Sequence, residues 1–131
     1  MSGEGLPGVL PRILLVEDDW KIAVALKKLV CGMGFEVVGP VPTVEQALAL
    51  IGSEEIDLAA LDLSLGAGQN SFPIARVLAA EGIPFLFISG YERSDFPAEF
   101  QEIPFCDKPY TYETLKHHLE ALLDGGPRKA K

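Results

Sequence analysis

Four short apolar runs in this chain each end on polar or charged side chains, and this repeated pattern constrains the fold more than any other feature. The runs with their endings are Leu14-Leu15-Val16 before Glu17-Asp18-Asp19, Leu58-Ala59-Ala60-Leu61 before Asp62, Phe85-Leu86-Phe87-Ile88 before Ser89, and Phe105-Cys106 before Asp107-Lys108-Pro109. Continuous apolar runs of this length are typical of strands that are buried on both faces of a parallel sheet. The carboxyl ends of such strands meet at one edge, where α/β proteins place their sites. The sequence therefore predicts one site, built from Glu17, Asp18, Asp62, Ser89 and Lys108.

Helical patterns lie between the apolar runs. We predict strands over residues 12–16, 35–38, 57–61, 84–88 and 103–106, and helices over 20–33, 44–51, 72–81 and from 112 to about 125. A preferred N-cap residue precedes each helix, namely Asp19, Thr43, Ser71 and Thr111. Parallel strands need a crossover, which is usually a helix, so the alternation predicts an α/β fold with a doubly wound, five-stranded parallel sheet.

The segment from 92 to 104 departs from this alternation. It contains two prolines, and its only helical spacing is that of Phe96, Phe100 and Ile103. We therefore expect the helix between the fourth and fifth strands to be short or irregular.

The composition fits a single acidic domain. A chain of 131 residues can bury a core of its own, and we assign residues 12–124 to the domain and 1–11 and 125–131 to flexible tails. The net charge of -8 argues against direct binding to nucleic acid. Because the chain has neither a signal-peptide pattern nor a run of roughly 18 apolar residues, we expect a soluble, cytoplasmic protein.

Three side chains outside the predicted site have simple structural interpretations. Cys31 and Cys106 lie in different apolar segments without a metal-binding spacing, so we predict two reduced, packed thiols. Trp20 begins a helical stripe and is predicted to lie in the core or at its edge.

The acidic side chains at the strand ends point to a divalent cation. Glu17 and Asp18 end one strand and Asp62 ends another, so we expect three carboxylates within a few ångströms of one another. Each pair would repel by about 4 kcal/mol at an effective dielectric constant near 20. An open set of oxygen ligands suits Mg²⁺, with Mn²⁺ as the alternative, better than zinc or copper.

The remaining predicted site residues suit a phosphoryl group. Lys108 supplies a fixed positive charge, Ser89 supplies a hydroxyl donor, and Gly90 leaves space and a backbone N–H. A carboxylate can accept a phosphoryl group, and most of the catalysis of that transfer is positioning and charge neutralisation.

Four motifs resemble those of a known family, the receiver domains of response regulators, in the family's order. They are Val16-Glu17-Asp18-Asp19, Leu61-Asp62-Leu63, Ile88-Ser89-Gly90 and Asp107-Lys108-Pro109-Tyr110, and the resemblance covers roughly residues 12–123. It implies the flavodoxin-like, CheY-like strand order 2-1-3-4-5. It also implies a phosphoacceptor in a two-component system rather than an enzyme.

The resemblance assigns a role to each site residue. Asp62 would be the phosphoacceptor, Asp18 a direct metal ligand, and Glu17 a ligand through water, with the backbone carbonyl of Ser64 as a further ligand. Lys108 would pair with the phosphoryl group, and the Lys108–Pro109 peptide bond would be cis.

The resemblance also implies a switch. Ser89 would be its hydroxyl and Phe105 its aromatic side chain, and both would act on the surface formed by 91–110. Ser64 and Tyr91 lie where relatives tune hydrolysis, and phosphorylation would order the segment 92–104.

A subgroup of stand-alone receivers is closer still. Residues 84–91, Pro-Phe-Leu-Phe-Ile-Ser-Gly-Tyr, resemble the Phe-Ala-Thr-Gly-X-Tyr signature of single-domain receivers from alphaproteobacteria, although Ile88 and Ser89 replace Ala-Thr and the spacer before Tyr91 is missing. The resemblance implies a sensor histidine kinase of the HWE or HisKA2 type, or a phosphotransfer protein, as the partner of a monomer or weak dimer.

Two other functions remain open on the residues alone. A phosphatase or phosphotransferase with an aspartate nucleophile would normally need a second acid two residues later, where this chain has Ser64. A degenerate receiver used as a binding scaffold would not need Asp18, Asp62, Ser89 and Lys108, all of which are present.

Overall fold

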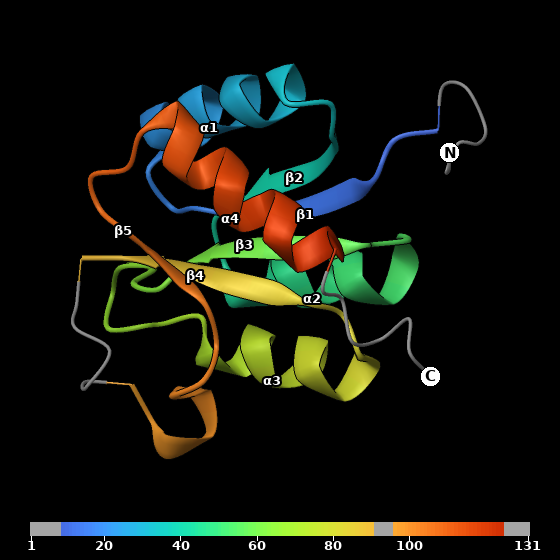
Figure 1. Ribbon diagram of the computed structural model, residues 1–131. Coiled ribbons are helices and arrows are strands. Elements are labelled where there is room, and N and C mark those ends of the chain that lie inside the picture. The colour runs from blue at the N-terminus through green and yellow to red at the C-terminus, as the bar shows by residue number, and fades with distance from the viewer. Residues whose placement is uncertain (1–8, 91–95, 125–131) are drawn as a thin grey trace.

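Five parallel strands in the order β2-β1-β3-β4-β5 form the centre of the computed structural model, which describes residues 9–90 and 96–124 (Figure 1). The strands are β1 (Arg12–Val16), β2 (Glu36–Val41), β3 (Leu58–Asp62), β4 (Phe85–Ser89) and β5 (Phe105–Asp107). The helices are α1 (Trp20–Gly32), α2 (Val44–Ser53), α3 (Phe72–Glu81) and α4 (Tyr112–Asp124), together with the short 3₁₀ helix η2 (Ala98–Phe100). The predicted fold class and strand order are confirmed.

The helices cover both faces of the sheet. In Figure 1, α1 and α4 lie on one side of the strands and α2 and α3 on the other. Each face has its own apolar cluster, because successive strand side chains point to opposite sides: Ile13 and Leu15 face α1 and α4, whereas Leu14 and Val16 face α2 and α3. Every residue of β3 and of β4 is buried, which explains their uninterrupted apolar sequences.

The strand register aligns the polar strand ends at one edge. Asp62 at the end of β3 pairs with Ile88 of β4, and Ser89 at the end of β4 pairs with Asp107 of β5. Just beyond β5, the Lys108 N–H donates to the Ser89 carbonyl at 3.0 Å. The Lys108–Pro109 peptide bond is cis, as the resemblance implied.

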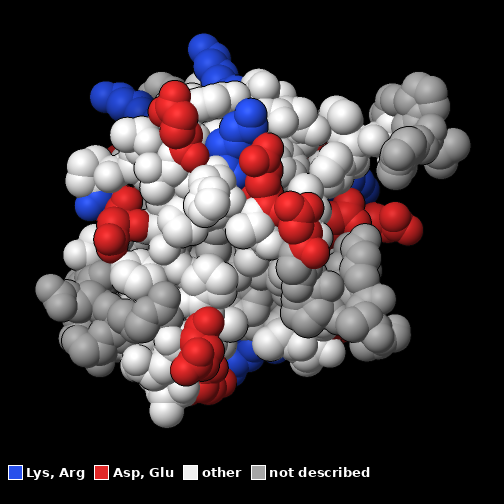
Figure 2. Space-filling model, viewed as in Figure 1, with Lys and Arg blue, Asp and Glu red and all other residues white. Residues whose placement is uncertain are grey.

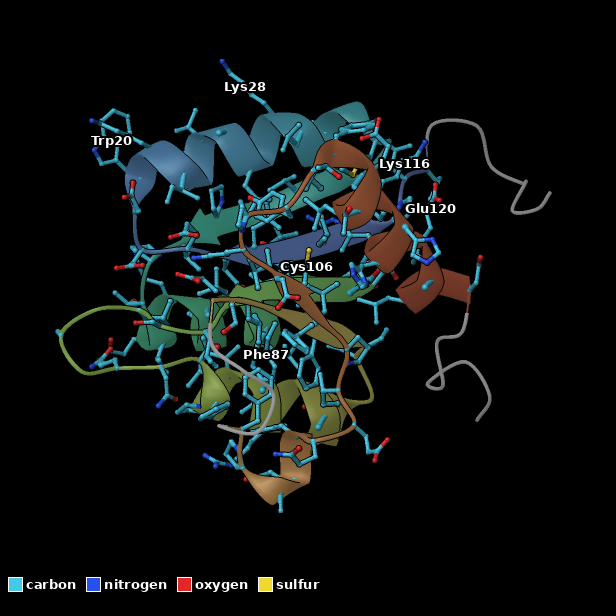
Figure 3. The ribbon with its side chains drawn as sticks, turned by 60° about the vertical axis from the view of Figure 1, so that its left-hand side comes forward. Trp20, Lys28, Phe87, Cys106, Lys116 and Glu120 are labelled. Atoms are coloured by element: carbon cyan, nitrogen blue, oxygen red, sulfur yellow. The ribbon has the colours of Figure 1, made fainter. Side chains whose placement is uncertain are left out.

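The first helix buries fewer side chains than its sequence suggested. Its buried residues are Ala23, Leu26 and Val30, and Trp20 is 71% exposed. Figure 3 shows Trp20 at the start of α1 and Lys28 further along, both projecting away from the sheet. The prediction of Trp20 in the core or at its edge was wrong, because the side chain lies off the buried stripe of α1.

One thiol and one helix cap also differ from expectation. Cys106 is buried as predicted, whereas Cys31 is exposed on α1. At the start of α3 the Phe72 N–H donates to Asn70 Oδ1 at 2.9 Å, so Asn70 performs the capping that we assigned to Ser71. Ser71 Oγ is buried and has no hydrogen-bond partner within the described part of the chain.

Aromatic side chains hold η2 against the sheet. Phe100 stacks on Phe72 of α3 with ring centroids 5.2 Å apart, and Phe96 lies between Phe87 and Phe105 at 5.3 and 5.5 Å. The helix between β4 and β5 is short in the described residues, as predicted.

Arg76 of α3 adds a charged contact to η2. Its guanidinium donates to Glu99 at 2.8 Å and lies 5.7 Å from the centroid of the Phe100 ring. This part of η2 therefore contacts α3 through both an ion pair and an aromatic ring.

Charged side chains mark the outer surface. Figure 2 shows basic side chains over α1, at the top of the view, and acidic side chains over α4 below it.

Across residues 9–90 and 96–124, none of the helices combines the length and the apolar character that a bilayer crossing requires. The tails predicted at 1–11 and 125–131 lie, apart from residues 9–11, outside the described residues.

The packing of η2 predicts a large cost for truncating Phe100. We expect Phe100→Ala to lower the free energy of unfolding by about 3–5 kcal/mol, because a buried ring that contacts three other rings is lost. The matched change at an exposed ring, Trp20→Ala, should cost within about 0.5 kcal/mol. Urea unfolding followed by circular dichroism measures both, and equal costs would contradict the packing described.

Candidate functional site

Three carboxylates converge at the carboxyl edge of the sheet. Glu17 and Asp18 follow β1 and Asp62 ends β3, and one carboxylate oxygen from each lies within 4.8 Å of the others. Glu17 is 4% exposed and Asp62 is 5% exposed, whereas Asp18 is open to solvent. These are the three acidic residues that the strand-end pattern brought together.

Lys108 completes the cluster from β5. Its Nζ donates to Asp62 Oδ1 at 2.8 Å, and its side chain is 36% exposed. The Lys108 ammonium, which follows β5, therefore reaches Asp62 at the end of β3 by crossing the end of β4. Ser89, at that end, is 2% exposed, and Gly90 after it is exposed.

Burial raises the pKa of both buried carboxyls. For Glu17, desolvation is the largest cause and the negative charge of Asp62 adds to it. The Asp19 N–H, which donates to Glu17 Oε2 at 3.1 Å, opposes them, and the resulting pKa is about 7. For Asp62, desolvation likewise raises the pKa, although the hydrogen bond and charge of Lys108 oppose it. One nearby ammonium thus does not offset the cost of burying these carboxylates.

The pKa of Lys108 responds to the same contacts. Burial alone would lower it, but the hydrogen bond and charge of Asp62, helped by the charge of Glu17, raise it above the ordinary value. Lys108 is therefore a permanent cation at physiological pH.

The loop between β3 and α3 forms one wall of the site. Ser64 and Asn70 bridge across it, and the Leu65 N–H donates to the Gln69 carbonyl at 3.0 Å. Its residue Gly66 has φ +78° and lies against Asp18. Apart from Ser64, no residue of this loop was given a role in the site from the sequence.

Tyr110 ends one of the four motifs but was given no role in the sequence analysis. It is half-buried, and burial raises the pKa of its phenol, with the charge of Glu17 as the next cause. Its position two residues after Lys108 was the only available signal.

The other predicted site residues have different surroundings. Phe105 is half-buried and contacts Phe96, and Ser64 is exposed in the loop after Asp62. Tyr91 lies outside the described residues.

The donor set fits a hard divalent cation. The ligands on offer are carboxylate oxygens, which Mg²⁺ prefers over the nitrogen and sulfur ligands of zinc sites. Burial raises the pKa of Glu17 and the negative charge of Asp62 adds to it, so the charged form of this acid is disfavoured without more positive charge nearby. A divalent ion would supply it.

Solved structures resemble this chain over most of its length. The solution structure of SdrG from Sphingomonas melonis Fr1 is 38% identical, with a TM-score of 0.75, and the match covers 87% of this chain and 97% of that one. A second solution structure of SdrG, in its BeF₃-activated conformation and from Pseudomonas melonis Fr1, is also 38% identical, with a TM-score of 0.75 over 88% of this chain and 98% of that one.

Two more distant structures share the fold. A CheY-like response regulator receiver domain protein from Methanospirillum hungatei is 23% identical, with a TM-score of 0.76 over 92% of this chain and 99% of that one. The response regulator TrrA from Thermotoga maritima, in complex with Mg²⁺-BeF, is 24% identical, with a TM-score of 0.76 over 87% of this chain and 100% of that one. No protein-family model and no curated protein sequence matches the chain.

The raised pKa of Glu17 predicts that metal-free protein becomes less stable as the pH rises. The folded state holds the Glu17 proton more tightly than the unfolded chain does, because the pKa rises from 4.5 to about 7 on folding. This contribution to stability is complete below pH 4.5 and is lost as the pH passes through about 7. Urea unfolding in EDTA between pH 5 and pH 8 measures it.

The control for this prediction is Glu17→Gln, which removes the titrating group and keeps its size. The pH dependence of its unfolding free energy should be shallower than that of the unaltered protein. Identical slopes for the two proteins would contradict the assignment to Glu17.

Proposed function

This chain belongs to the CheY-like receiver domains of response regulators, and from that premise we propose that it accepts a phosphoryl group on Asp62 in a two-component system. The observation that carries the proposal is the position of Asp62, buried beside the ammonium of Lys108 and the carboxylates of Glu17 and Asp18. We assign residues 12–124 to this single receiver domain. We propose that it works as a signalling phosphoacceptor rather than as an enzyme.

The proposed transfer is a displacement at phosphorus. A carboxylate oxygen of Asp62 forms the new P–O bond as the P–N bond to a phosphohistidine breaks, and the imidazole nitrogen leaves with the bonding electrons and takes up a proton. The Lys108 ammonium lies 2.8 Å from Asp62, so it can stabilise the carboxylate before the transfer and the negative phosphoryl oxygens after it. Ser89 and Gly90 offer a hydroxyl and an N–H at the same edge.

Mg²⁺ is the cofactor that the carboxylates suit best, and Mn²⁺ remains the alternative. We propose that Asp18 and Asp62 bind it directly, Glu17 through water, and Ser64 through its carbonyl. When bound, it would neutralise charge on the carboxylates and on the phosphoryl oxygens. The Mg²⁺-BeF complex of TrrA supports this choice by analogy of fold.

Ser64 argues against an aspartate-based phosphatase. A general acid at that position would protonate the leaving group, but the chain has a hydroxyl there, and its side chain is exposed. A scaffold without phosphoryl chemistry is disfavoured because the costly burial of the Asp62 carboxylate, with Lys108 as its partner, has no purpose in it.

We propose that the signal leaves the site through Ser89 and Phe105. Ser89 lies at the buried end of β4 and Phe105 begins β5, where its ring is 5.5 Å from that of Phe96. A phosphoryl group that draws the Ser89 hydroxyl toward it would change the space available to Phe105, and through Phe96 the packing of η2. The 91–110 surface would then differ between the two states.

The proposed partner is a sensor histidine kinase, of the HWE or HisKA2 type if the chain belongs to the single-domain subgroup, or a phosphotransfer protein. We propose a cytoplasmic location for this chain, because its kinase partner would draw the phosphoryl group from ATP. The chain would then act as a phosphate sink, a shuttle or a regulator of its kinase, as a monomer or weak dimer.

Phosphorylation of Asp62 is tested with a small donor. Incubation with acetyl phosphate and Mg²⁺ should add the mass of one phosphoryl group, as seen by intact mass spectrometry, and Asp62→Asn should abolish the adduct. Omission of Mg²⁺ should also abolish it, because the crowded carboxylates would repel the anionic donor.

Asp19→Asn is the matched control for that experiment. Asp19 is next to the cluster but caps α1, where its Oδ1 accepts the Lys21 N–H at 2.9 Å, and Asn caps as well as Asp. The adduct should form normally in this variant. An adduct that persists in Asp62→Asn would place the phosphoryl group elsewhere and reject the proposal.

The switch is tested by hydrogen exchange across 92–104. Phe96 and Phe100 are already buried, so for the described residues 96–104 we expect Mg²⁺ with BeF₃⁻ to slow the exchange of a backbone that is already packed against the sheet. Ser89→Ala should remove the slowing while leaving the mass adduct. Exchange in α2 is the internal control, and unchanged exchange across 92–104 in the unaltered protein would refute the switch.

A further inference from the structure

The loop between β3 and α3 approaches Asp18 so closely that a side chain at Gly66 would crowd the Asp18 carboxylate. A Cβ atom at Gly66 would lie 3.0 Å from Asp18 Oδ2 and 4.0 Å from Asp18 Cγ. The first distance is shorter than an ordinary contact, so the carboxylate would have to move by a few tenths of an ångström. A side chain at Gly66 would therefore crowd one of the three cluster carboxylates.

Asp18 is held differently from its two neighbours. Glu17 accepts the Asp19 N–H at 3.1 Å, and Asp62 accepts Lys108 Nζ at 2.8 Å. Across residues 9–90 and 96–124, no hydrogen bond or ion pair is made by the Asp18 carboxylate. Its placement comes from its attachment at the end of β1 and from its contact with Gly66.

The loop itself is well supported at this point. The Gln69 N–H donates to the Gly66 carbonyl at 2.8 Å, and the Ser71 N–H donates to the Leu63 carbonyl at 3.0 Å. Because these bonds and the Ser64–Asn70 bridge close the loop, the backbone at Gly66 cannot retreat easily. A side chain there would displace Asp18 rather than the loop.

We propose that Gly66 is a positioning residue of the metal site, whose bare backbone keeps Asp18 Oδ2 where it can bind the cation. This inference rests on the proposed function, because it concerns the ion that Asp18 would hold. Mg²⁺ demands near-octahedral geometry with oxygen distances of about 2.0–2.1 Å. A carboxylate displaced by a few tenths of an ångström fits that requirement poorly.

Gly68 in the same loop provides a matched control. The two glycines have nearly the same left-handed backbone, with φ +78° at Gly66 and +75° at Gly68, so an alanine is strained to a similar degree at either. A Cβ at Gly68 would meet nothing within 4 Å. The two alanine variants therefore share the backbone cost, and only Gly66→Ala crowds Asp18.

The first test is the dissociation constant for Mg²⁺, measured by isothermal titration calorimetry. We expect Gly66→Ala to weaken binding roughly tenfold or more, as is usual when the support of a metal ligand is lost, and Gly68→Ala to bind like the unaltered protein. Equal constants for the two variants would overturn the inference and leave phosphorylation of Asp62 standing. An unaltered protein that binds no Mg²⁺ would overturn both.

The second test measures the contact without metal and copes with a variant that folds poorly. In EDTA, urea unfolding should show Gly66→Ala to be less stable than Gly68→Ala. In an Asp18→Ala background, which removes Oδ2, that difference should disappear, because the crowded atom is gone. A difference that persists in this background would overturn the proposed contact.

Discussion

Asp62 has almost no contact with solvent, and the ammonium of Lys108 at 2.8 Å is the interaction that makes a carboxylate tolerable there. The pair joins the end of β3 to the residue after β5, with β4 between them. It can form only when all three strands are in their observed order and register. The site therefore depends on the sheet being complete, and the sheet carries at its edge a charge cost that a metal ion would relieve.

The parts of the fold that could be predicted from sequence are those governed by burial on both faces. β3 and β4 are buried at every position, so their apolar runs have no interpretation other than central strands. The same argument located Glu17 and Asp62, because each is the first polar residue after a buried apolar run and lies at the sheet edge. Lys108 lies one residue further on, after Asp107 of β5. The weak helical pattern between β4 and β5 similarly predicted the short η2.

Local choices between equivalent residues were not predictable. Ser71 and Asn70 are both good N-caps, and only the path of the loop decides that Asn70 reaches the Phe72 N–H. Trp20 and Cys31 belong to an apolar helix, but the buried stripe of α1 is narrow and excludes both. The closeness of Gly66 to Asp18 joins residues far apart in sequence, so no spacing rule could reveal it.

Helix α3 contacts both η2 and the loop that follows Asp62 at the carboxyl edge of the sheet. At the start of α3, the Phe72 N–H donates to Asn70 of the loop after Asp62. One turn later, Arg76 forms an ion pair with Glu99 and lies over the Phe100 ring. A helix is stiff over such a short span. A displacement of that loop would therefore act on η2 through α3 as well as along β4.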